Sequence, residues 1–481
     1  MSTFIGRKLE LEKLKTLLQK KSASLIVIRG RRRVGKSRLI QEFSKGKETF
    51  VFSGLPPSSR TTDESQRNEF AEQMSRLLGI PVLKDHSWND LFWHLAEQIN
   101  KKKGKEKIIL VLDEISWIGS KDPDFLGKIK NLWDLYLSQN PHIICILCGS
   151  ASVWIEENIL SNTGFVGRVS LALVLQELPL KDCYLFWAGQ KNRISSHEIF
   201  KVLSVTGGVP KYLEEVNPKL SAEENINRLC FQPEGLLFRE FDQIFSDLFL
   251  KKATVFKQIV QHLSNGPQNL DSLCEYLNWE KSGTVSGYLH ELFLAGFIMI
   301  DTTWNLKTKK NSTLQAYRLS DNYLRFYLKY INPNKEQIES GLFHFKSLTS
   351  LPGWNTIMGF QFENLVVNNY LKLIELLKID PNDIIRLGPF FQNPTKRQKG
   401  CQIDLLIQTK YGCIYPCEVK FYASEIPKSV ATTFKQKLNT LSLPQKNTSI
   451  RPVLIHCNGV TDSVREMDLF DYIIDFSELL I

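Results

Sequence analysis

Long uncharged hydrophobic runs are missing from the 481-residue sequence. No stretch reaches the roughly 18 to 20 apolar residues that a membrane-spanning helix needs. Residues 1–12 carry charges where a signal peptide would have its apolar region. We therefore expect a soluble, cytoplasmic protein without a membrane partner.

Cysteines are few, and their 9 positions are an odd number scattered over a long chain. A disulfide scaffold is therefore not expected. Cys145 and Cys148 have the spacing of a redox or zinc pair, but they lie in the apolar run 143–148, with no second Cys/His pair at zinc-site spacing nearby. We interpret both as buried strand residues.

Low-complexity tracts, internal repeats and an excess of proline or glycine are also missing. The 43% hydrophobic and 23% charged fractions are those of an ordinary globular protein. At about 150 residues per domain, the length favours about three domains. The net charge of +10 favours anionic partners and leaves open whether these are nucleotides, nucleic acid or lipid headgroups.

Three short apolar runs, at residues 24–28, 108–112 and 143–147, have the pattern of central strands covered on both faces. Helical patterns separate them, which is typical of an α/β fold with a parallel sheet. From about residue 180 the pattern becomes helical. The sequence thus predicts a parallel-sheet domain followed by helices.

A glycine-rich basic segment at residues 30–37, Gly-Arg-Arg-Arg-Val-Gly-Lys-Ser, fits the phosphate-loop pattern between a strand and a helix. Such a loop points amides at phosphate oxygens, and the helix that follows favours negative charge at its start. Lys36 is expected to bridge the β- and γ-phosphates of ATP, and Ser37 to hold Mg²⁺. The predicted nucleotide-binding residues of this segment are Gly30, Val34, Gly35, Lys36, Ser37 and Arg38.

Two carboxylates follow the second predicted strand. Asp113 closes the run 108–112 and is predicted to hold the magnesium ion together with Ser37. Glu114 is predicted to polarise the water that attacks the γ-phosphate. A helix-capping role for Glu114 is the alternative.

Further short motifs surround this site: Phe4-Ile5-Gly6-Arg7, Cys148-Gly149-Ser150, Gly167-Arg168 and the segment 207–213, Gly-Gly-Val-Pro-Lys-Tyr-Leu. With the phosphate loop they resemble archaeal-type ATPases of the AAA+/STAND group of P-loop NTPases that carry an uncharacterised C-terminal domain. The match extends to residues 320–326, which are similar to the junction into that domain.

The resemblance implies a role for each motif. The segment 4–7 would cradle the adenine, and Ser150 would contact the γ-phosphate or the attacking water. Arg168 would be a sensor or an arginine finger, acting on its own chain or on a neighbour in an oligomer. Pro210 would pack near the base from a helical lid. The alternatives are a strand end at Ser150, a structural role for Arg168 and a simple helix stop at residues 207–210.

Residues 254–331 read as three short helices and a hairpin, the layout of a winged helix. Lys307, Lys309 and Lys310 lie between its strands and are candidates to contact DNA phosphates without reading sequence. The resemblance implies the alternative of an internal relay that packs on the ATPase and passes on its state.

Two further strands are expected at residues 401–407 and 413–421. Glu418 and Lys420 are two residues apart and so share one face of a strand, which Asp404 reaches from its neighbour. Glu363 on the preceding helix supplies another carboxylate.

In order, Glu363, Asp404, Glu418 and Lys420 resemble the PD-(D/E)XK nuclease motif, although Ile403 replaces its proline and Pro416 suggests an edge strand or a bulge. This resemblance implies that the carboxylates bind Mg²⁺ and that Lys420 orients the nucleophile. An inactive scaffold, in which Lys420 only neutralises the carboxylates, is the alternative.

Together these features predict an α/β protein: a P-loop parallel-sheet ATPase with a helical lid at 1–225, a winged helix at 226–335 and a smaller α/β nuclease-like domain at 336–481. The expected function is an ATP- and Mg²⁺-dependent switch associated with nucleic acid. An ATP-regulated DNA nuclease and a slow signalling scaffold that binds a protein partner are the alternatives.

Overall fold

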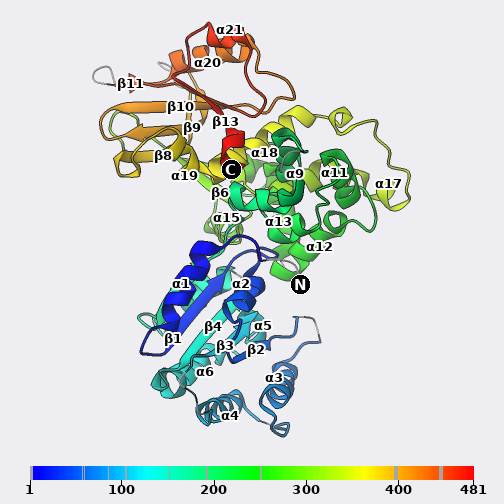
Figure 1. Ribbon diagram of the computed structural model, residues 1–481, viewed down its shortest axis with the longest axis vertical. Coiled ribbons are helices and arrows are strands. Elements are labelled where there is room, and N and C mark those ends of the chain that lie inside the picture. The colour runs from blue at the N-terminus through cyan, green and yellow to red at the C-terminus, as the bar shows by residue number, and fades with distance from the viewer. Residues whose placement is uncertain are drawn as a thin grey trace. The chain divides into compact units, whose positions relative to one another are not determined.

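The computed structural model describes residues 4–56, 58, 60–84, 86–102, 104, 106–150, 152–190, 193–249, 252–394, 399–443 and 448–480. The chain divides into two compact units (Figure 1). Unit 1 comprises Met1–Glu177, Ile244–Leu250 and Leu294–Gly296, and unit 2 comprises the remainder. Within the described ranges, every helix is too short or too polar to cross a membrane.

Unit 1 is built on a five-stranded sheet in the order β2-β3-β4-β1-β5, in which all neighbours are parallel. The three strands expected from the apolar runs are all present. The strands are β1 (Ser24–Arg29), β2 (Thr49–Ser53), β3 (Ile108–Asp113), β4 (Ile143–Gly149) and β5 (Val169–Val174).

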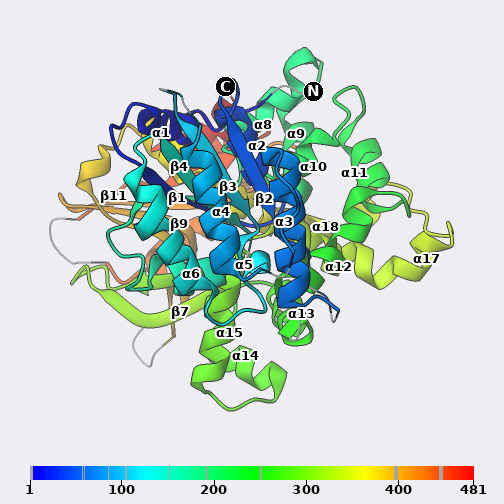
Figure 2. The ribbon, with the colours of Figure 1, turned by 90° about the horizontal axis from the view of Figure 1, so that it is seen from below.

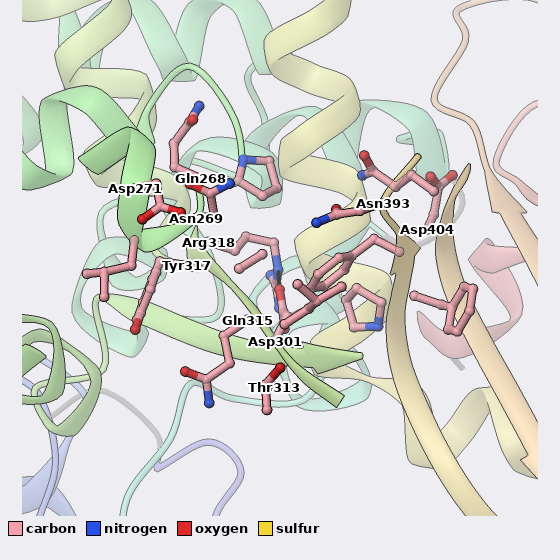
Figure 3. Close-up of a pocket in the computed structure, with 18 of the residues that line it drawn as sticks. Gln268, Asn269, Asp271, Asp301, Thr313, Gln315, Tyr317, Arg318, Asn393 and Asp404 are labelled. Atoms are coloured by element: carbon pink, nitrogen blue, oxygen red, sulfur yellow. Dashed lines mark hydrogen bonds and ion pairs between the residues drawn. The ribbon is translucent and has the colours of Figure 1, made fainter. Parts of the chain in front are cut away.

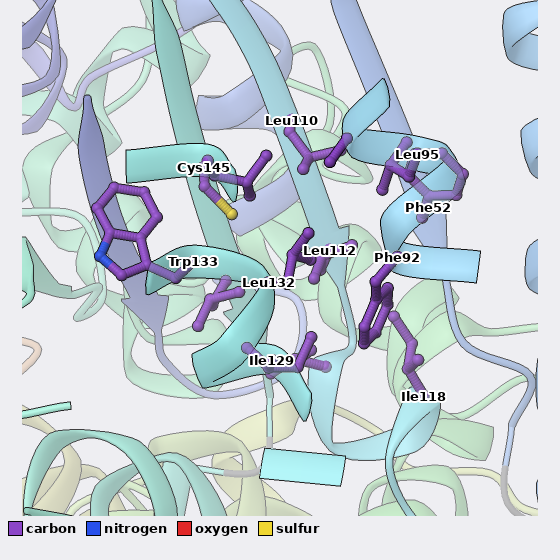
Figure 4. Close-up of a cluster of buried hydrophobic side chains, with 14 of the residues drawn as sticks. Phe52, Phe92, Leu95, Leu110, Leu112, Ile118, Ile129, Leu132, Trp133 and Cys145 are labelled. Atoms are coloured by element: carbon purple, nitrogen blue, oxygen red, sulfur yellow. The ribbon is translucent and has the colours of Figure 1, made fainter. Parts of the chain in front are cut away.

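Helices cover both faces of this sheet because successive strand residues point to opposite sides. One face packs against α1 (Lys8–Leu18) and α2 (Lys36–Phe43). The other packs against α3 (Asp63–Leu78), α4 (Trp88–Asn100) and α6 (Phe125–Asn131), and Figure 4 shows part of this second core. Both faces are therefore apolar, as the continuous runs predicted.

The cysteines of β4 take part in these two cores. Cys145 packs in the second core, and Cys148 in the core beneath α1 and α2. Burial raises the pKa of both thiols. The interpretation of the pair as buried strand residues is confirmed.

Unit 2 begins with helices that the sequence analysis had placed in part with the ATPase, up to residue 225. They are α8 (Leu180–Tyr184), α9 (Ser196–Thr206), α10 (Pro210–Glu214), α11 (Ala222–Cys230) and α12 (Leu236–Phe249), of which the last enters unit 1 at Ile244. Figure 2 shows α9, α10 and α11 near one another.

The expected three helices and a hairpin follow. The helices are α13 (Ala253–Leu263), α14 (Leu270–Leu277) and α15 (Gly283–Leu294), and the hairpin consists of β6 (Ile298–Trp304) and β7 (Asn311–Leu319). An isolated bridge between Gln268 and Tyr317 adds the segment before α14 to the hairpin. This hairpin is called the β6–β7 hairpin below.

The C-terminal part of unit 2 is a mixed sheet in the order β13-β12-β10-β9-β8. The antiparallel strands β8, β9 and β10 follow a long helix, and a second helix leads to the parallel strands β12 and β13. The elements are α18 (Trp354–Asn368), β8 (Ile384–Gln392), β9 (Cys401–Thr409), β10 (Cys413–Val419), α20 (Lys428–Thr440), β12 (Val453–His456) and β13 (Tyr472–Asp475).

Pro416 does not mark an edge strand, because β10 lies between β9 and β12. Its partner on β9 is Leu406. On the other side, β10 pairs with the short strand β11 (Ser449–Ile450) as far as Ile414, and with β12 from Cys417 onward. The missing amide hydrogen of the proline therefore falls where the ladder passes from β11 to β12.

The β6–β7 hairpin shares a hydrophobic core with the C-terminal sheet. Trp304 and Leu306 pack in one cluster with Phe390 of β8 and Ile403 of β9. The indole nitrogen of Trp304 donates a buried hydrogen bond of 2.9 Å to Oε1 of Gln408. The hairpin and the sheet, which the sequence analysis separated at residue 335, thus form one packed body.

Candidate functional site

The phosphate loop connects the end of β1 to the start of α2 in unit 1. A Cβ atom at Gly30 would lie 2.5 Å from the carbonyl oxygen of Leu175, so only glycine fits there. Gly35 has a φ of 95° and is the N-cap of α2. Val34 is fully buried and anchors the loop in the core below. The loop is thus shaped by glycines and held by one apolar side chain.

Lys36 points back into this loop. Its Nζ donates hydrogen bonds of 2.9 Å to the carbonyl oxygen of Gly30 and 3.1 Å to that of Arg31. Burial lowers the pKa of the ammonium group, although Cys148, Glu114 and Asp113 oppose this shift. A buried cation in a loop of main-chain amides is an environment that attracts phosphate.

Ser37 and Asp113 meet at the carboxyl end of the sheet, as predicted. The hydroxyl of Ser37 donates to Oδ2 of Asp113 over 3.2 Å, and Oδ1 of Asp113 accepts from the amide of Glu114 over 3.0 Å. A hydroxyl and a carboxylate are hard oxygen ligands of the kind that Mg²⁺ prefers. The two groups therefore fit a magnesium ion in their chemistry.

Glu114 binds Ser150 across the neighbouring strand ends. The amide of Ser150 donates to the Glu114 carboxylate over 3.0 Å, and its hydroxyl donates over 3.0 and 3.1 Å. Glu114 is the N-cap of α5 (Ile115–Ile118), with a φ of 49°, but its side chain makes no capping bond. The carboxylate thus holds Ser150, directly after β4, rather than a helix end.

Arg168 does not lie at the phosphate loop. It precedes β5 at the amino-terminal end of the parallel strands, because Val169 pairs with Leu25 near the start of β1. The phosphate loop follows the other end of β1. Its guanidinium binds Asp134 through two bonds of 2.7 and 2.8 Å. The hydrogen bond from Arg168 is the main reason that the pKa of Asp134 falls to about 2. The geometry thus gives no support for action on the nucleotide of its own chain.

Arg38 and Pro210 were also predicted to bind the nucleotide. Arg38 is half-buried on α2, where it donates to Oε1 of Gln41 over 2.9 Å. Pro210 begins α10 in unit 2, at a position where proline is favoured because its missing amide hydrogen has no helical partner. Their roles toward the nucleotide stay predictions.

Two arginines support the loop in ways that the sequence did not predict. Arg7, assigned to the adenine box, donates to the carbonyl oxygen of Val34 over 3.0 Å and also to that of Gln176. Arg31 forms an ion pair of 3.1 Å with Glu177. Because these partners are 27 to 169 residues apart, no local pattern could reveal them.

The predicted C-terminal residues come together in unit 2. Nζ of Lys420 lies 2.8 Å from Oε1 of Glu418 and 3.8 Å from Oδ2 of Asp404. The same Asp404 oxygen accepts from the amide of Val419 over 2.9 Å. Glu363 faces the same hollow from α18. All four motif residues therefore belong to one site, called the carboxylate site below.

Charge in this site is crowded and partly neutralised. Burial raises the pKa of Glu363 to about 8, with Asp404 as a further cause. Burial also raises the pKa of Asp404, followed by the charge of Glu418. Burial lowers the pKa of Lys420, but the charges of Asp404 and Glu418 outweigh it and the net shift is upward.

A second lysine was missed by the sequence analysis. Lys437 on α20 binds both oxygens of Glu418, over 3.0 and 2.8 Å. Glu418 is only 2% exposed and is thus clamped between two lysines. Within the described ranges, no three His, Cys, Asp or Glu side chains gather closely enough to hold a metal ion. The carboxylate oxygens of this site suit Mg²⁺, but the Glu418 carboxylate is paired with two lysines.

The lysines predicted to contact DNA lie at the turn of the β6–β7 hairpin. Lys307 and Lys310 are exposed, whereas Lys309 is half-buried and donates to the carbonyl oxygen of Lys410 over 3.4 Å. On α15, the small residues Gly283 and Ser286 are exposed. DNA contact by these residues stays a prediction.

A phosphate loop between a strand and a helix, with a carboxylate closing the neighbouring strand, defines a P-loop nucleotide-binding unit. Residues 4–216 match a family described as an ATPase domain predominantly from Archaea. Residues 327–431 match a family described as archaeal and bacterial proteins of unknown function. The chain thus carries an archaeal-type P-loop ATPase domain followed by this second domain, in agreement with the resemblance seen in the sequence.

Individual proteins are similar to this chain. The chain is 25% identical over 405 residues to an uncharacterized protein of Methanocaldococcus jannaschii, covering 84% of each. Its fold is similar to the Walker-type ATPase of Pyrococcus abyssi, at 16% identity and a TM-score of 0.49 over 68% of this chain and 96% of that one. Its fold is also similar to the Aeropyrum pernix ORC2 protein in its ADPNP–ADP complexes, at 13% identity and a TM-score of 0.44 over 71% of this chain and 97% of that one.

Proposed function

We propose that this protein binds ATP with Mg²⁺ at the phosphate loop and hydrolyses it as a nucleotide-driven switch. The observation that carries the proposal is the 3.2 Å contact between Ser37 and Asp113, beside the buried ammonium of Lys36. Ser37 and Asp113 would hold Mg²⁺, which would neutralise the negative charge of the phosphates.

The contacts of the loop indicate how it would respond to a nucleotide. Lys36 now binds two loop carbonyl oxygens, and a phosphate would offer it a charged acceptor in their place. Glu114 is bound to Ser150 and would have to exchange that partner for a water in order to act as a general base. Arg168 precedes β5 at the opposite end of the parallel strands, which favours action on a neighbouring chain of an oligomer over action on its own nucleotide.

Replacement of Lys36 by alanine tests the ATPase. The variant removes the ammonium group that hydrogen-bonds to the loop carbonyls of Gly30 and Arg31. We expect ATP hydrolysis to fall about 100-fold or more, the effect of losing one preorganised charge contact. The measurement is phosphate release by the full chain.

Lys45→Ala is the matched control, because Lys45 follows α2 and pairs with Glu42 at the surface. It should hydrolyse ATP at the rate of the unaltered chain. Equal hydrolysis by Lys36→Ala and the unaltered protein would contradict the proposal.

We further propose that the carboxylate site cleaves phosphodiester bonds of nucleic acid, under control of the ATPase. The supporting observation is that Glu363 of α18, Asp404 of β9 and Lys420, which directly follows β10, meet in one hollow although they span 58 positions. Lys420 would stabilise negative charge on the phosphate, and Lys437 would position Glu418. A bound divalent ion would supply an activated water.

Lys420→Ala tests this cleavage. Loss of the ammonium should reduce Mg²⁺-dependent cutting of a DNA substrate about 100-fold, because Lys420 pairs with both Asp404 and Glu418. Lys428→Ala, an exposed site on α20, is the control. Equal cutting by the Lys420 variant would trace the activity to a contaminant, and a stable protein partner without cutting would favour a scaffold.

A further inference from the structure

A cavity of about 460 Å³ opens beside the carboxylate site (Figure 3). The β6–β7 hairpin and residues 267–271 line one part, and β8, β9 and α18 line the other. Figure 3 shows Gln315 and Thr313 on the hairpin side and Asp404 and Asn393 across from them. All lining residues belong to unit 2.

A second, wider hollow of about 1100 Å³ meets this cavity. The two share Glu363, Gln402 and Asp404 in their walls. The wider hollow alone contains Lys420 and Lys437. The carboxylate site therefore lies where two hollows of different chemistry join.

The wider hollow has the side chains that bind a phosphate backbone. Besides Lys420 and Lys437 it contains Lys399, Thr433 and Thr440. Lysines and hydroxyl groups are common phosphate contacts in nucleic-acid complexes. A backbone that passes along α20 would bring its phosphates to Asp404 and Lys420.

The smaller cavity has side chains suited to nucleobases. Gln315, Asn393 and Gln402 are exposed amides in its wall, and amides both donate and accept hydrogen bonds, as base edges require. The half-buried Phe391 adds an aromatic ring, and bases stack on such rings without regard to sequence. This lining contrasts with the lysines of the wider hollow.

The size of the cavity favours bases that are not paired. Its volume falls within the roughly 300 to 1,000 Å³ of small-ligand sites and is too small for a duplex. A base also has to leave its pair before amides can reach its Watson–Crick edge. The hairpin is tied to β8 beside the cavity, since the Thr303 hydroxyl donates to the Phe391 carbonyl oxygen over 2.7 Å.

We infer that unit 2 binds an unpaired nucleic-acid strand across the carboxylate site, with its phosphates along α20 and one or two bases in the cavity beside the hairpin. The inference deepens the proposed phosphodiester cleavage and rests on it only for the path of the backbone. The unpaired strand can be DNA or RNA, since both present the same base edges and phosphates.

Fluorescence anisotropy with the full chain in EDTA tests this inference without cleavage. The probes are a labelled 12-nucleotide DNA, the RNA of the same sequence and the blunt DNA duplex. We expect at least one single strand to bind about tenfold more tightly than the duplex. Gln315→Ala should weaken that binding about three- to tenfold, the effect of one lost hydrogen bond.

Gln337→Ala is the matched control, because Gln337 is an exposed amide on α17 (Lys335–Glu339) outside both hollows. It should bind like the unaltered chain. Duplex binding as tight as that of both single strands, or an unchanged affinity in Gln315→Ala, would overturn the inference. A Gln315 effect without any Mg²⁺-dependent cutting would support the inference while refuting the proposed cleavage.

Discussion

At the scale of single residues, the ion pair of Arg168 and Asp134 links structure to pH. The pKa of Asp134 is lowered from its ordinary value of 3.8 to about 2, chiefly by the hydrogen bond from Arg168. A carboxyl group with a lowered folded pKa stabilises the fold above its unfolded pKa, and this stabilisation disappears as the pH falls through the folded value. The stabilisation by this ion pair is therefore lost as the pH falls from about 4 to about 2.

Asp134→Asn should accordingly destabilise the protein at neutral pH and have less effect in acid. Both side chains are about 30% exposed, so solvent screening reduces the expected loss to about 1 kcal/mol at pH 7. The measurement is the melting temperature of variant and unaltered chain at pH 7, 5 and 3. The difference in melting temperature between Asp134→Asn and the unaltered chain should narrow at pH 3. Asp124→Asn, at an exposed site directly before α6, should melt like the unaltered chain at each pH. A difference in melting temperature that is the same at all three pH values would contradict this role of the Arg168–Asp134 pair.

The carboxylate site shows a different residue-scale rule, because a buried charge needs a partner. Glu418 is nearly inaccessible and would be costly as an isolated anion. Lys420 was predictable from its period-2 spacing, whereas Lys437 reaches Glu418 from a separate helix. Sequence spacing identified one of the two cations that this carboxylate requires.

At the scale of elements, the junction of β1 with the phosphate loop depends on close backbone packing. The amide of Leu175 donates to the carbonyl oxygen of Arg29 over 2.8 Å, which extends the pairing of β5 with β1 past the strand ends. The chain after β5 therefore runs directly against Gly30.

Gly30→Ala should destabilise unit 1 by about 1 to 3 kcal/mol, as overpacking generally does. The new Cβ would lie 2.5 Å from the Leu175 carbonyl oxygen, so the backbone would have to move. Thermal unfolding followed by circular dichroism gives the test. Gly127→Ala on α6 serves for comparison, because a Cβ there meets no atom within 4 Å and alanine favours a helix. Equal melting temperatures for both variants would contradict the packing argument.

Strands β1, β3 and β4 of unit 1 were predictable because each is a continuous apolar run that both helical layers cover, whereas the edge strands β2 and β5 are only partly buried and were not predicted. Strand β10 was harder to interpret, since a proline in a strand usually indicates an edge. The structure places that proline at the point where β10 changes partners from β11 to β12. Pairing between distant strands is a tertiary property, and local sequence does not contain it.

At the scale of the whole molecule, domain boundaries were the least predictable feature. The family match to the ATPase ends at residue 216, whereas unit 1 ends its long first segment at Glu177. The β6–β7 hairpin and the C-terminal sheet share one core through Trp304 and Phe390. Domain boundaries depend on which elements pack together in space. The contacts between such elements, for example the hydrogen bond from Trp304 to Gln408, join residues 104 positions apart.

The sequence alone determined the phosphate loop and the carboxylate beside it, because the loop is contiguous and Asp113 directly ends an apolar strand. It also determined which four residues form the carboxylate site, since their spacing follows strand and helix geometry. Only the tertiary structure decided that Arg168 pairs with Asp134, that Lys437 clamps Glu418 and that Arg7 holds the loop. Each of these contacts joins residues from separate elements, and the physical reason is that charge pairing acts through space whereas a sequence pattern records only neighbours along the chain.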